Sequence, residues 1–350
     1  MVAGHRIDVN ISREVHLAMK DGLIDVHHHA RPRAFFDALA ETGRTTMGGR
    51  PLPPGWTADR ALSLMDEMRI ATAFLSAPDA DLLYRDRTIA LKLSRLMNEL
   101  FARSIQTHPE RFGGFASLPM PHLDDSLIEI AYALDQLKLD GVMLSTSYDG
   151  DYLGSPTFFP VLSELNRRGS VAFVHPVSPI GMSAFKLDFP ASLIEYAFDT
   201  TRCIANLLRN DIPARFPGIR FIFSHAGGTA PYLAGRLSLM EPFLTPGREF
   251  RLKEDYSAIE KGLRSFYYDT ALAAFDSVLS LVGELVGMKR MVFGSDYPQV
   301  PDDFIRASAN SIFHSPAVSD TDRDNVKRGN ALILFPRLEE SAPGHSRPIP

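Results

Sequence analysis

The chain has 350 residues, of which 45% are hydrophobic and 23% charged, and its formal net charge is -5. This length and hydrophobic content predict a globular protein with one large core, and the negative charge without a basic stripe argues against a general nucleic-acid-binding protein. The single cysteine, Cys203, excludes an internal disulfide bond and a cysteine-based zinc site. We expect Cys203 to be a buried packing residue and not a nucleophile, and we expect a cytoplasmic protein without a membrane span.

Short β-rich runs alternate with helical segments along the chain. The eight runs predicted as strands are Leu23–His29, Ala71–Ala77, Phe112–Leu118, Gly141–Thr146, Ser170–His175, Ile219–His225, Phe266–Thr270 and Met291–Asp296. The segments with helical periodicity are Thr57–Met68, Thr88–Thr107, Leu123–Leu137, Thr157–Arg168, Thr200–Phe216, Ala230–Phe243, Asp276–Val286 and Asp303–Phe313. Strands that alternate with amphipathic helices predict parallel β-α-β units, and eight units favour a closed (β/α)₈ barrel of the TIM type over an open sheet.

Four segments lie outside this regular pattern. We expect residues 1–21 to be an N-terminal extension, residues 22–336 to be one barrel domain, and residues 337–350 to be a mobile tail. Residues 31–55 form a long excursion after the first strand, which on a barrel often covers the active end. Residues 245–260 are expected to be a polar insertion before the seventh strand.

The run Asp25-Val26-His27-His28-His29 ends the first predicted strand. Side chains alternate between the faces of a strand, so His27 and His29 share one face and His28 takes the other. Two imidazoles on one face can hold a divalent metal ion, and Asp25 on the same face could hold the second nitrogen of a ligand. A polar loop that happens to be rich in histidine is the alternative interpretation.

Three further strands end in metal-binding side chains. The fifth ends in His175, the sixth in His225 and the eighth in Asp296. Active sites of these barrels lie at the carboxyl ends of the strands, so we expect one site at this end.

The roles of these residues follow from coordination chemistry. His27, His29 and His175 are the expected nitrogen ligands of the metal, and Asp296 supplies an oxygen or a proton. His225 is the remaining base, suited to general acid–base catalysis. The fourth strand ends in Ser145-Thr146 without a lysine that could bridge two metals, which favours one metal ion.

Four motifs carry a family resemblance, in the order DVHHH, FVHP, FSHAGG and GSDYP. Together they resemble the branch of the amidohydrolase superfamily that contains α-amino-β-carboxymuconate-ε-semialdehyde decarboxylase, from about Leu23 to about Phe335. The segments GWTADRALSLMDEMRIATAFLSAP and HPERFGGFASLPMPHLDDSLIEIAYAL are more similar still to proteins that resemble 6-methylsalicylate decarboxylase.

The resemblance implies metal-dependent, non-oxidative decarboxylation of an aromatic or muconate-like carboxylate, with no organic cofactor. His27, His29, His175 and Asp296 match the family's metal ligands, and His225 matches a histidine that activates water or handles protons. Arg236 matches an arginine that reaches a neighbouring subunit's site to hold a carboxylate. This match implies a homodimer or homotetramer, and a salt bridge on the helix surface is the alternative for Arg236.

The expected reaction is the decarboxylation of a hydroxyaryl, salicylate-like carboxylate, with protonation at the ipso carbon by Asp296 and help from His225. The expected metal is Zn²⁺, with Mn²⁺ as the alternative. Candidate ring contacts are Phe35, Trp56, Phe185, Phe198 and Phe275, each of which is otherwise a core residue. Arg44 and Arg50 are candidate partners of a carboxylate, and as loop residues they are otherwise solvated.

Two other functions fit the same residues. A metal-dependent hydrolase or lactonase of an aromatic-catabolism intermediate would use the same metal and His225 to activate water. A binding protein on an inactive barrel is the third class, and the presence of all five site residues argues against it.

Overall fold

The computed structural model describes residues 21–43, 53–77, 86–182, 188–190 and 192–340, with the backbone alone of residues 46, 47, 50 and 51. The predicted N-terminal extension, apart from Asp21, and residues 341–350 of the predicted tail lie outside the described residues. Within the described part of the chain, no helix combines the length and apolar character that crossing a membrane requires.

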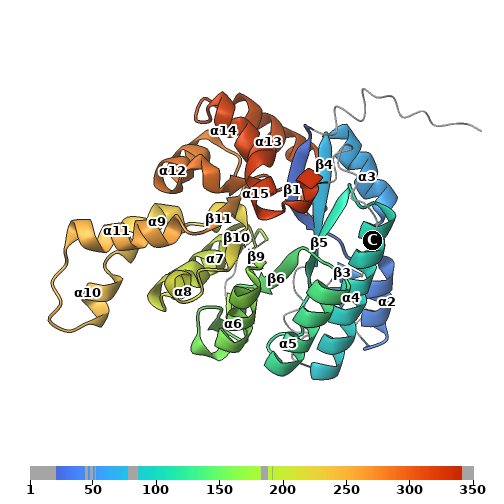
Figure 1. Cartoon of the computed structure of the whole chain (residues 1–350), viewed down its shortest axis with the longest axis horizontal. Coiled ribbons are helices and arrows are strands. Elements are labelled where there is room, and N and C mark those ends of the chain that lie inside the picture. Colours follow the sequence, from blue (N-terminus) through green and yellow to red (C-terminus); the bar gives the residue numbers. More distant parts are fainter. Residues whose placement is uncertain are drawn as a thin grey trace, which may run out of the picture.

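Eight parallel strands form one sheet whose spatial order follows the chain (Figure 1). They are β1 (Leu23–His29), β4 (Ile70–Ser76), β5 (Phe112–Ala116), β6 (Gly141–Ser145), β9 (Val171–His175), β10 (Arg220–Phe223), β11 (Tyr267–Asp269) and β12 (Met291–Val292). Two small hairpins accompany this sheet, β2 (Thr46–Met47) with β3 (Arg50–Pro51) and β7 (Ser147–Tyr148) with β8 (Asp151–Tyr152).

Helices surround the sheet. The α-helices are α2 (Arg33–Ala40), α3 (Ala58–Glu67), α4 (Arg87–Thr107), α5 (Leu123–Ala131), α6 (Phe159–Arg168), α7 (Ser192–Arg209), α8 (Ile212–Arg215), α9 (Ala230–Leu237), α10 (Met240–Leu244), α11 (Leu252–Leu263), α12 (Asp276–Val286), α13 (Asp302–His314), α14 (Asp320–Asp324), α15 (Asn330–Leu334) and α16 (Arg337–Glu340). Short 3₁₀ or π turns are η1 (Tyr132–Gln136), η2 (Pro156–Phe158), η4 (His225–Gly227), η5 (Met288–Arg290) and η6 (Asn325–Gly329).

The sheet closes between its first strand and the segment that follows its last strand. The amide of Val26 donates to the carbonyl of Phe293 (3.0 Å), and the amide of His29 donates to the carbonyl of Tyr297 (2.7 Å). In the opposite direction, the amide of Asp296 donates to the carbonyl of His27 (2.9 Å). The predicted (β/α)₈ barrel is therefore confirmed, and its closure brings the chain around Asp296 against the end of β1.

Two apolar clusters fill the protein, one inside the barrel and one between the strands and the helices. The inner cluster includes Ile24, Phe115 and Phe173 from the strands, together with Leu334 of α15 and Leu338 of α16. Residues of α15 and α16 therefore contribute to the core of the barrel.

The predicted tail begins later than expected. Residues Arg337–Glu340 form α16 instead of a mobile segment. Leu338 is buried, and the guanidinium of Arg337 is paired with Asp140 and donates to the carbonyl of Phe112 (3.3 Å). This helix therefore packs on the barrel.

The predicted polar insertion at residues 245–260 is exposed from Thr245 to Glu254, and its second half belongs to a helix that was not predicted, α11. Tyr256, Ile259 and Leu263 pack against the outer core at helical spacing. Asp255 is buried and is paired with the guanidinium of Arg248. Figure 1 shows α9, α10 and α11 extending from one side of the barrel.

Candidate metal centre

Strand β1 brings its histidines to the barrel interior through an irregularity in its pairing. Ile24 and Val26 belong to the inner cluster, so strict alternation would turn His28 inward and His27 outward. The pairing of β1 with β4 shifts register between Asp25 and His28. A bulge of this kind re-aims the side chains that follow it.

The result is that His27 and His29 meet inside the barrel, as expected, with their Nε2 atoms 3.0 Å apart. The ring of His27 also packs edge-on against the inner Phe173 at a centroid distance of 5.0 Å. His28 takes the other side, where its ring lies 4.7 Å from that of Tyr297.

Four buried side chains converge at this end of the barrel. Each of His27, His29, His175 and Asp296 offers one ligand atom, and these atoms all lie within 4.8 Å of one another. The Oδ1 atom of Asp296 is 3.3 Å from Nε2 of His27 and 3.0 Å from Nε2 of His29. This buried group could bind a metal ion.

Each histidine of the group is held through its second ring nitrogen. Nδ1 of His27 donates to Oδ2 of Asp269 (2.7 Å), and Nδ1 of His175 donates to the carbonyl of Pro176 (2.8 Å). Nδ1 of His29 lies 3.0 Å from Oγ of Ser76. The Ser76 hydroxyl donates to the carbonyl of His28 (3.3 Å), so it accepts from His29. These bonds leave each Nε2 for the metal, which is the usual arrangement around a metal-bound imidazole.

Two buried polar atoms at the centre of the group have surroundings that suit a cation. Oδ1 of Asp296 and Nε2 of His225 are buried and form no hydrogen bond with any described residue. Buried polar atoms without a partner are costly. Three imidazole nitrogens and one carboxylate oxygen are a suitable ligand set for a divalent cation, so the residues present fit the ion that the sequence predicts.

His225 completes the group without belonging to the four. Its Nε2 is 3.6 Å from Oδ2 of Asp296, and its ring centroid is 5.5 Å from that of His175. Both His225 (φ 54°) and Asp296 (φ 60°) adopt the left-handed backbone conformation, which costs about 1–3 kcal/mol outside glycine and clusters at functional sites. The two residues therefore leave their strands and turn into the site.

The family follows from the comparison with known proteins. A family model described as amidohydrolase matches residues 24–337. The chain belongs to the amidohydrolase family. This amidohydrolase is 36% identical over 323 residues to 6-methylsalicylic acid decarboxylase of Penicillium expansum, with 90% of this chain and 97% of the relative covered.

More distant relatives agree with this assignment. The amidohydrolase is 26% identical over 254 residues to 2-amino-3-carboxymuconate-6-semialdehyde decarboxylase of Dictyostelium discoideum, with 69% of this chain and 66% of the relative covered. Dihydroxybenzoic acid decarboxylase from Polaromonas sp. JS666, solved with bound manganese and the inhibitor 2-nitroresorcinol, has a similar fold. Its TM-score is 0.74 at 22% identity, with 90% of this chain and 97% of that chain covered. The family predicted from the four motifs is confirmed.

Charge is unevenly distributed over the imidazoles of this amidohydrolase. Burial lowers the pKa of His27, but the negative charges of Asp269 and Asp296 outweigh burial and raise the pKa to about 10. Burial lowers the pKa of His29 to about 3, and burial also holds the pKa of His175 well below its usual range. In the metal-free protein, His27 therefore carries a proton at neutral pH and the other two rings are neutral.

This proton predicts that metal binding depends on pH. A metal ligand must be a neutral imidazole, so the metal displaces the proton from His27 and loses affinity as the pH falls. We expect Kd to rise about tenfold per pH unit between pH 8 and pH 6. Competition with a chromophoric chelator at three pH values measures the metal Kd. A Kd that does not change with pH would contradict the assignment of a proton to His27.

Asp269 is a site residue that the sequence analysis missed, and Asp25 does not have its expected role. Asp269 is fully buried, holds Nδ1 of His27 and accepts from the amide of His225 (2.9 Å). Asp25 instead accepts from the amide of His27 (3.0 Å) and from the amide (2.9 Å) and hydroxyl (2.6 Å) of Ser295. Asp25 therefore ties β1 to the segment that carries Asp296. It points away from the imidazoles, because the bulge that follows it turns His27 inward.

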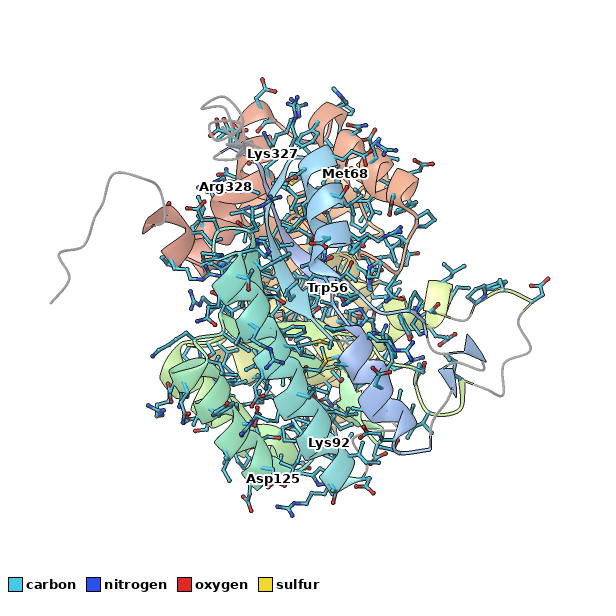
Figure 2. The ribbon with its side chains drawn as sticks, turned by 90° about the vertical axis from the view of Figure 1, so that its right-hand side faces the viewer. Trp56, Met68, Lys92, Asp125, Lys327 and Arg328 are labelled. Carbon is cyan, nitrogen blue, oxygen red and sulfur yellow. The ribbon has the colours of Figure 1, made fainter. Side chains whose placement is uncertain are left out.

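Trp56 lies on the other side of β1, contrary to the expected ring contact with substrate. Its Nε1 donates to Nε2 of His28 (3.2 Å), and its indole packs edge-on against Phe112 at 5.7 Å. Trp56 belongs to the outer core and precedes α3 (Figure 2). Its contacts support His28 and not the imidazole cluster.

The other aromatic candidates are divided between core and surface. Phe35 is a core residue packed against Phe36. Phe198 on α7 and Phe275 are 41% and 53% exposed. Phe185 lies outside the described residues. An aromatic side chain that the sequence analysis did not single out, Tyr196 of α7, is edge-on to His175 at 6.2 Å.

The arginine candidates differ in how they are placed. Arg236 is exposed near the end of α9, and its guanidinium forms no hydrogen bond or ion pair with any described residue, so the alternative of a helix-surface salt bridge is not observed there. Arg50 is described by its backbone alone, in β3, and Arg44 lies outside the described residues. Cys203 is buried as expected, and burial raises its thiol pKa well above the usual value, which argues against a nucleophilic role.

Proposed function

We propose that this amidohydrolase is a metal-dependent decarboxylase that converts a hydroxyaryl, salicylate-like carboxylate and one proton into the corresponding phenol and CO₂. The observation that carries the proposal is the 36% identity to 6-methylsalicylic acid decarboxylase, which extends over 97% of that relative. The predicted reaction class, a carboxy-lyase of the amidohydrolase superfamily, is confirmed by this relative and by the similarity to the Dictyostelium decarboxylase.

We propose that His27, His29, His175 and Asp296 hold one divalent cation. Three imidazole nitrogens favour Zn²⁺, and Mn²⁺ is the alternative because the Polaromonas decarboxylase contains manganese. When bound, the cation supplies charge neutralisation and a fixed orientation for the substrate carboxylate and its ortho oxygen.

The proton must reach the ipso carbon through residues of this chain. Burial raises the pKa of Asp296, but the positive charge of His27 outweighs burial and holds the pKa well below its usual range. Asp296 is therefore a carboxylate at neutral pH and needs a proton before it can donate one. His225 lies 3.6 Å from its Oδ2 atom, so we infer that His225 supplies the proton and Asp296 delivers it.

Protonation of the ipso carbon breaks the aromaticity of the ring, and loss of CO₂ restores it. The barrier therefore lies mainly in the proton transfer. A well-placed acid contributes typically 10²- to 10⁴-fold to such a step.

We also propose substrate contacts outside the metal group. Phe198 of α7 and Arg50 of β3 are candidates on this chain. Arg236 is the candidate from a neighbouring copy, since it is exposed without a partner among the described residues, and this role requires a homodimer or homotetramer. A cytoplasmic location stays a prediction from the single cysteine.

Product analysis tests the proposed reaction. The metal-loaded protein is incubated with a panel of salicylates and pyrone lactones, and CO₂ and aromatic products are quantified. We expect CO₂ and a phenol in equal amounts from at least one salicylate, and release that is about 10³-fold slower from a His225→Gln variant. Ring opening without CO₂ would instead identify a hydrolase.

A further inference from the structure

A further buried carboxylate, Asp199, is linked to the metal group by hydrogen bonds. It is fully buried in α7, although its neighbour Phe198 is 41% exposed. Its side chain accepts from the hydroxyls of Thr146 and Tyr152 (2.9 Å to Tyr152) and from the amide of Val177 (3.1 Å). These donors lie after β6, in β8 and after β9, so Asp199 joins three segments at the carboxyl end of the barrel.

One of these bonds leads directly to a metal ligand. The amide of Val177 and the carbonyl of Pro176 belong to the same peptide unit. Asp199 Oδ2 holds the amide end of this unit, and the carbonyl end accepts from Nδ1 of His175 (2.8 Å). The rigid, planar peptide therefore connects Asp199 to the imidazole of His175.

A second connection runs through Thr146. Its hydroxyl donates to Oδ2 of Asp199, and its amide donates to the carbonyl of His175 (3.0 Å). The Asp199 carboxylate thus constrains both the backbone of His175 and the Pro176 carbonyl that accepts from the His175 ring.

His175 needs this support more than the other two ligands do. His27 and His29 are held by the side chains of Asp269 and Ser76, which belong to strands of the sheet. The acceptor for His175 is a backbone carbonyl just past the end of β9, where no strand pairing fixes it. A hydrogen bond to another element, such as the one from the Val177 amide to Asp199 of α7, fixes the orientation of this carbonyl.

We propose that Asp199 is a positioning residue of the metal centre, which aims Nε2 of His175 at the metal by fixing the Pro176–Val177 peptide. The proposal rests on the proposed metal site. Asp199 itself touches neither the metal nor the substrate, so its effect is on metal affinity. Partners that orient metal-bound imidazoles typically contribute 10- to 100-fold to metal affinity.

The alternative role of Asp199 is to attach α7 to the barrel, and three variants separate the two roles. Asp199→Ala removes the acceptor of the Val177 amide. Asp199→Asn retains it, because the amide oxygen can occupy the Oδ2 position while its nitrogen donates to the Tyr152 hydroxyl. Tyr152→Phe is the matched control, since it removes a bond to Oδ1 and leaves the bond from Val177 in place.

Zn²⁺ and Mn²⁺ dissociation constants are measured by chelator competition, and the thermal midpoint of the metal-free proteins by circular dichroism. We expect Asp199→Ala to weaken metal binding about tenfold. The metal dissociation constants of Asp199→Asn should stay within about threefold of those of the parent protein. Tyr152→Phe should lower the thermal midpoint without changing the dissociation constants. Where the alanine variant does not fold, Asp199→Ser is measured in its place, since its short hydroxyl does not span the gap to the amide.

A double variant shows whether the effect passes through His175. In the His175→Ala background, Asp199→Ala should cause no further loss of metal affinity, because the ring that it orients is gone. Unchanged affinity in Asp199→Ala, or a full additional loss in the double variant, would overturn the proposal. Failure of the parent protein to bind either metal would instead overturn the proposed function.

Discussion

Replacing Asp296 with asparagine is expected to lower kcat by about 10³-fold while the protein keeps most of its bound metal. Oδ1 of Asp296 lies among the imidazoles and Oδ2 faces His225, so the two oxygens have separate tasks. An asparagine oxygen can remain at the first position, but the amide cannot carry a proton from His225 to the substrate. Stopped-flow detection of CO₂ release gives kcat, and metal analysis of the same sample gives the amount of bound metal.

His225→Gln is the matched variant for this prediction. It removes the proton source and leaves the four ligand atoms unchanged, so it should bind the full amount of metal and lose a similar factor in kcat. The double variant should be little slower than either single variant, because the two residues act in one transfer. Near-normal turnover of Asp296→Asn would show that the proton arrives by another route.

Replacing Asp269 with alanine is expected to remove most bound metal and most activity. Asp269 accepts from Nδ1 of His27 (2.7 Å), from the amide of His225 (2.9 Å) and from the amide of Ala271 (3.0 Å). Its loss frees the ring of His27, which should weaken metal binding 10- to 100-fold. It also releases the left-handed backbone of His225 from its acceptor.

Asp255→Ala is a suitable control for Asp269→Ala, because Asp255 is also a buried carboxylate that accepts from a side chain and a backbone amide. It lies in α11, on the part of the molecule that extends from the barrel (Figure 1). Both variants should lose stability, and Asp269→Ala should lose about 1–3 kcal/mol for each buried donor left without a partner. Only Asp269→Ala should lose metal affinity, as measured by chelator competition, and equal metal affinities would mean that Asp269 has a structural role alone.

The barrel could be predicted because apolar runs and helical periodicity are local features of the sequence. The eight strand runs all occur in the sheet, and β1 has the predicted bounds. The sixth and eighth strands end earlier than predicted, at Phe223 and Val292. The left-handed conformations of His225 and Asp296 prevent these residues from continuing a strand.

The metal group could be predicted because its members are of the right type and lie at strand ends. The supporting acids could not be predicted in the same way. Asp269 also stands at a strand end, and this position was the one signal that could have identified it. Asp199 lies within a helix, where the sequence alone does not distinguish a buried acid from a solvated one. The bulge in β1 and the outward position of Trp56 depend on contacts of β1 with β4 and with the segment after β12, which no local pattern encodes.

The proposed metal-dependent decarboxylation is tested most directly by a metal titration of stripped protein with a salicylate whose carboxyl carbon is labelled with ¹³C. Labelled CO₂ and bound metal are measured in the same samples. We expect no release of labelled CO₂ from the stripped protein, and a rate that rises with metal occupancy and reaches its maximum at one divalent ion per chain. Full release from the stripped protein, or none from the fully loaded protein with any salicylate of the panel, would contradict the proposed metal-dependent decarboxylation.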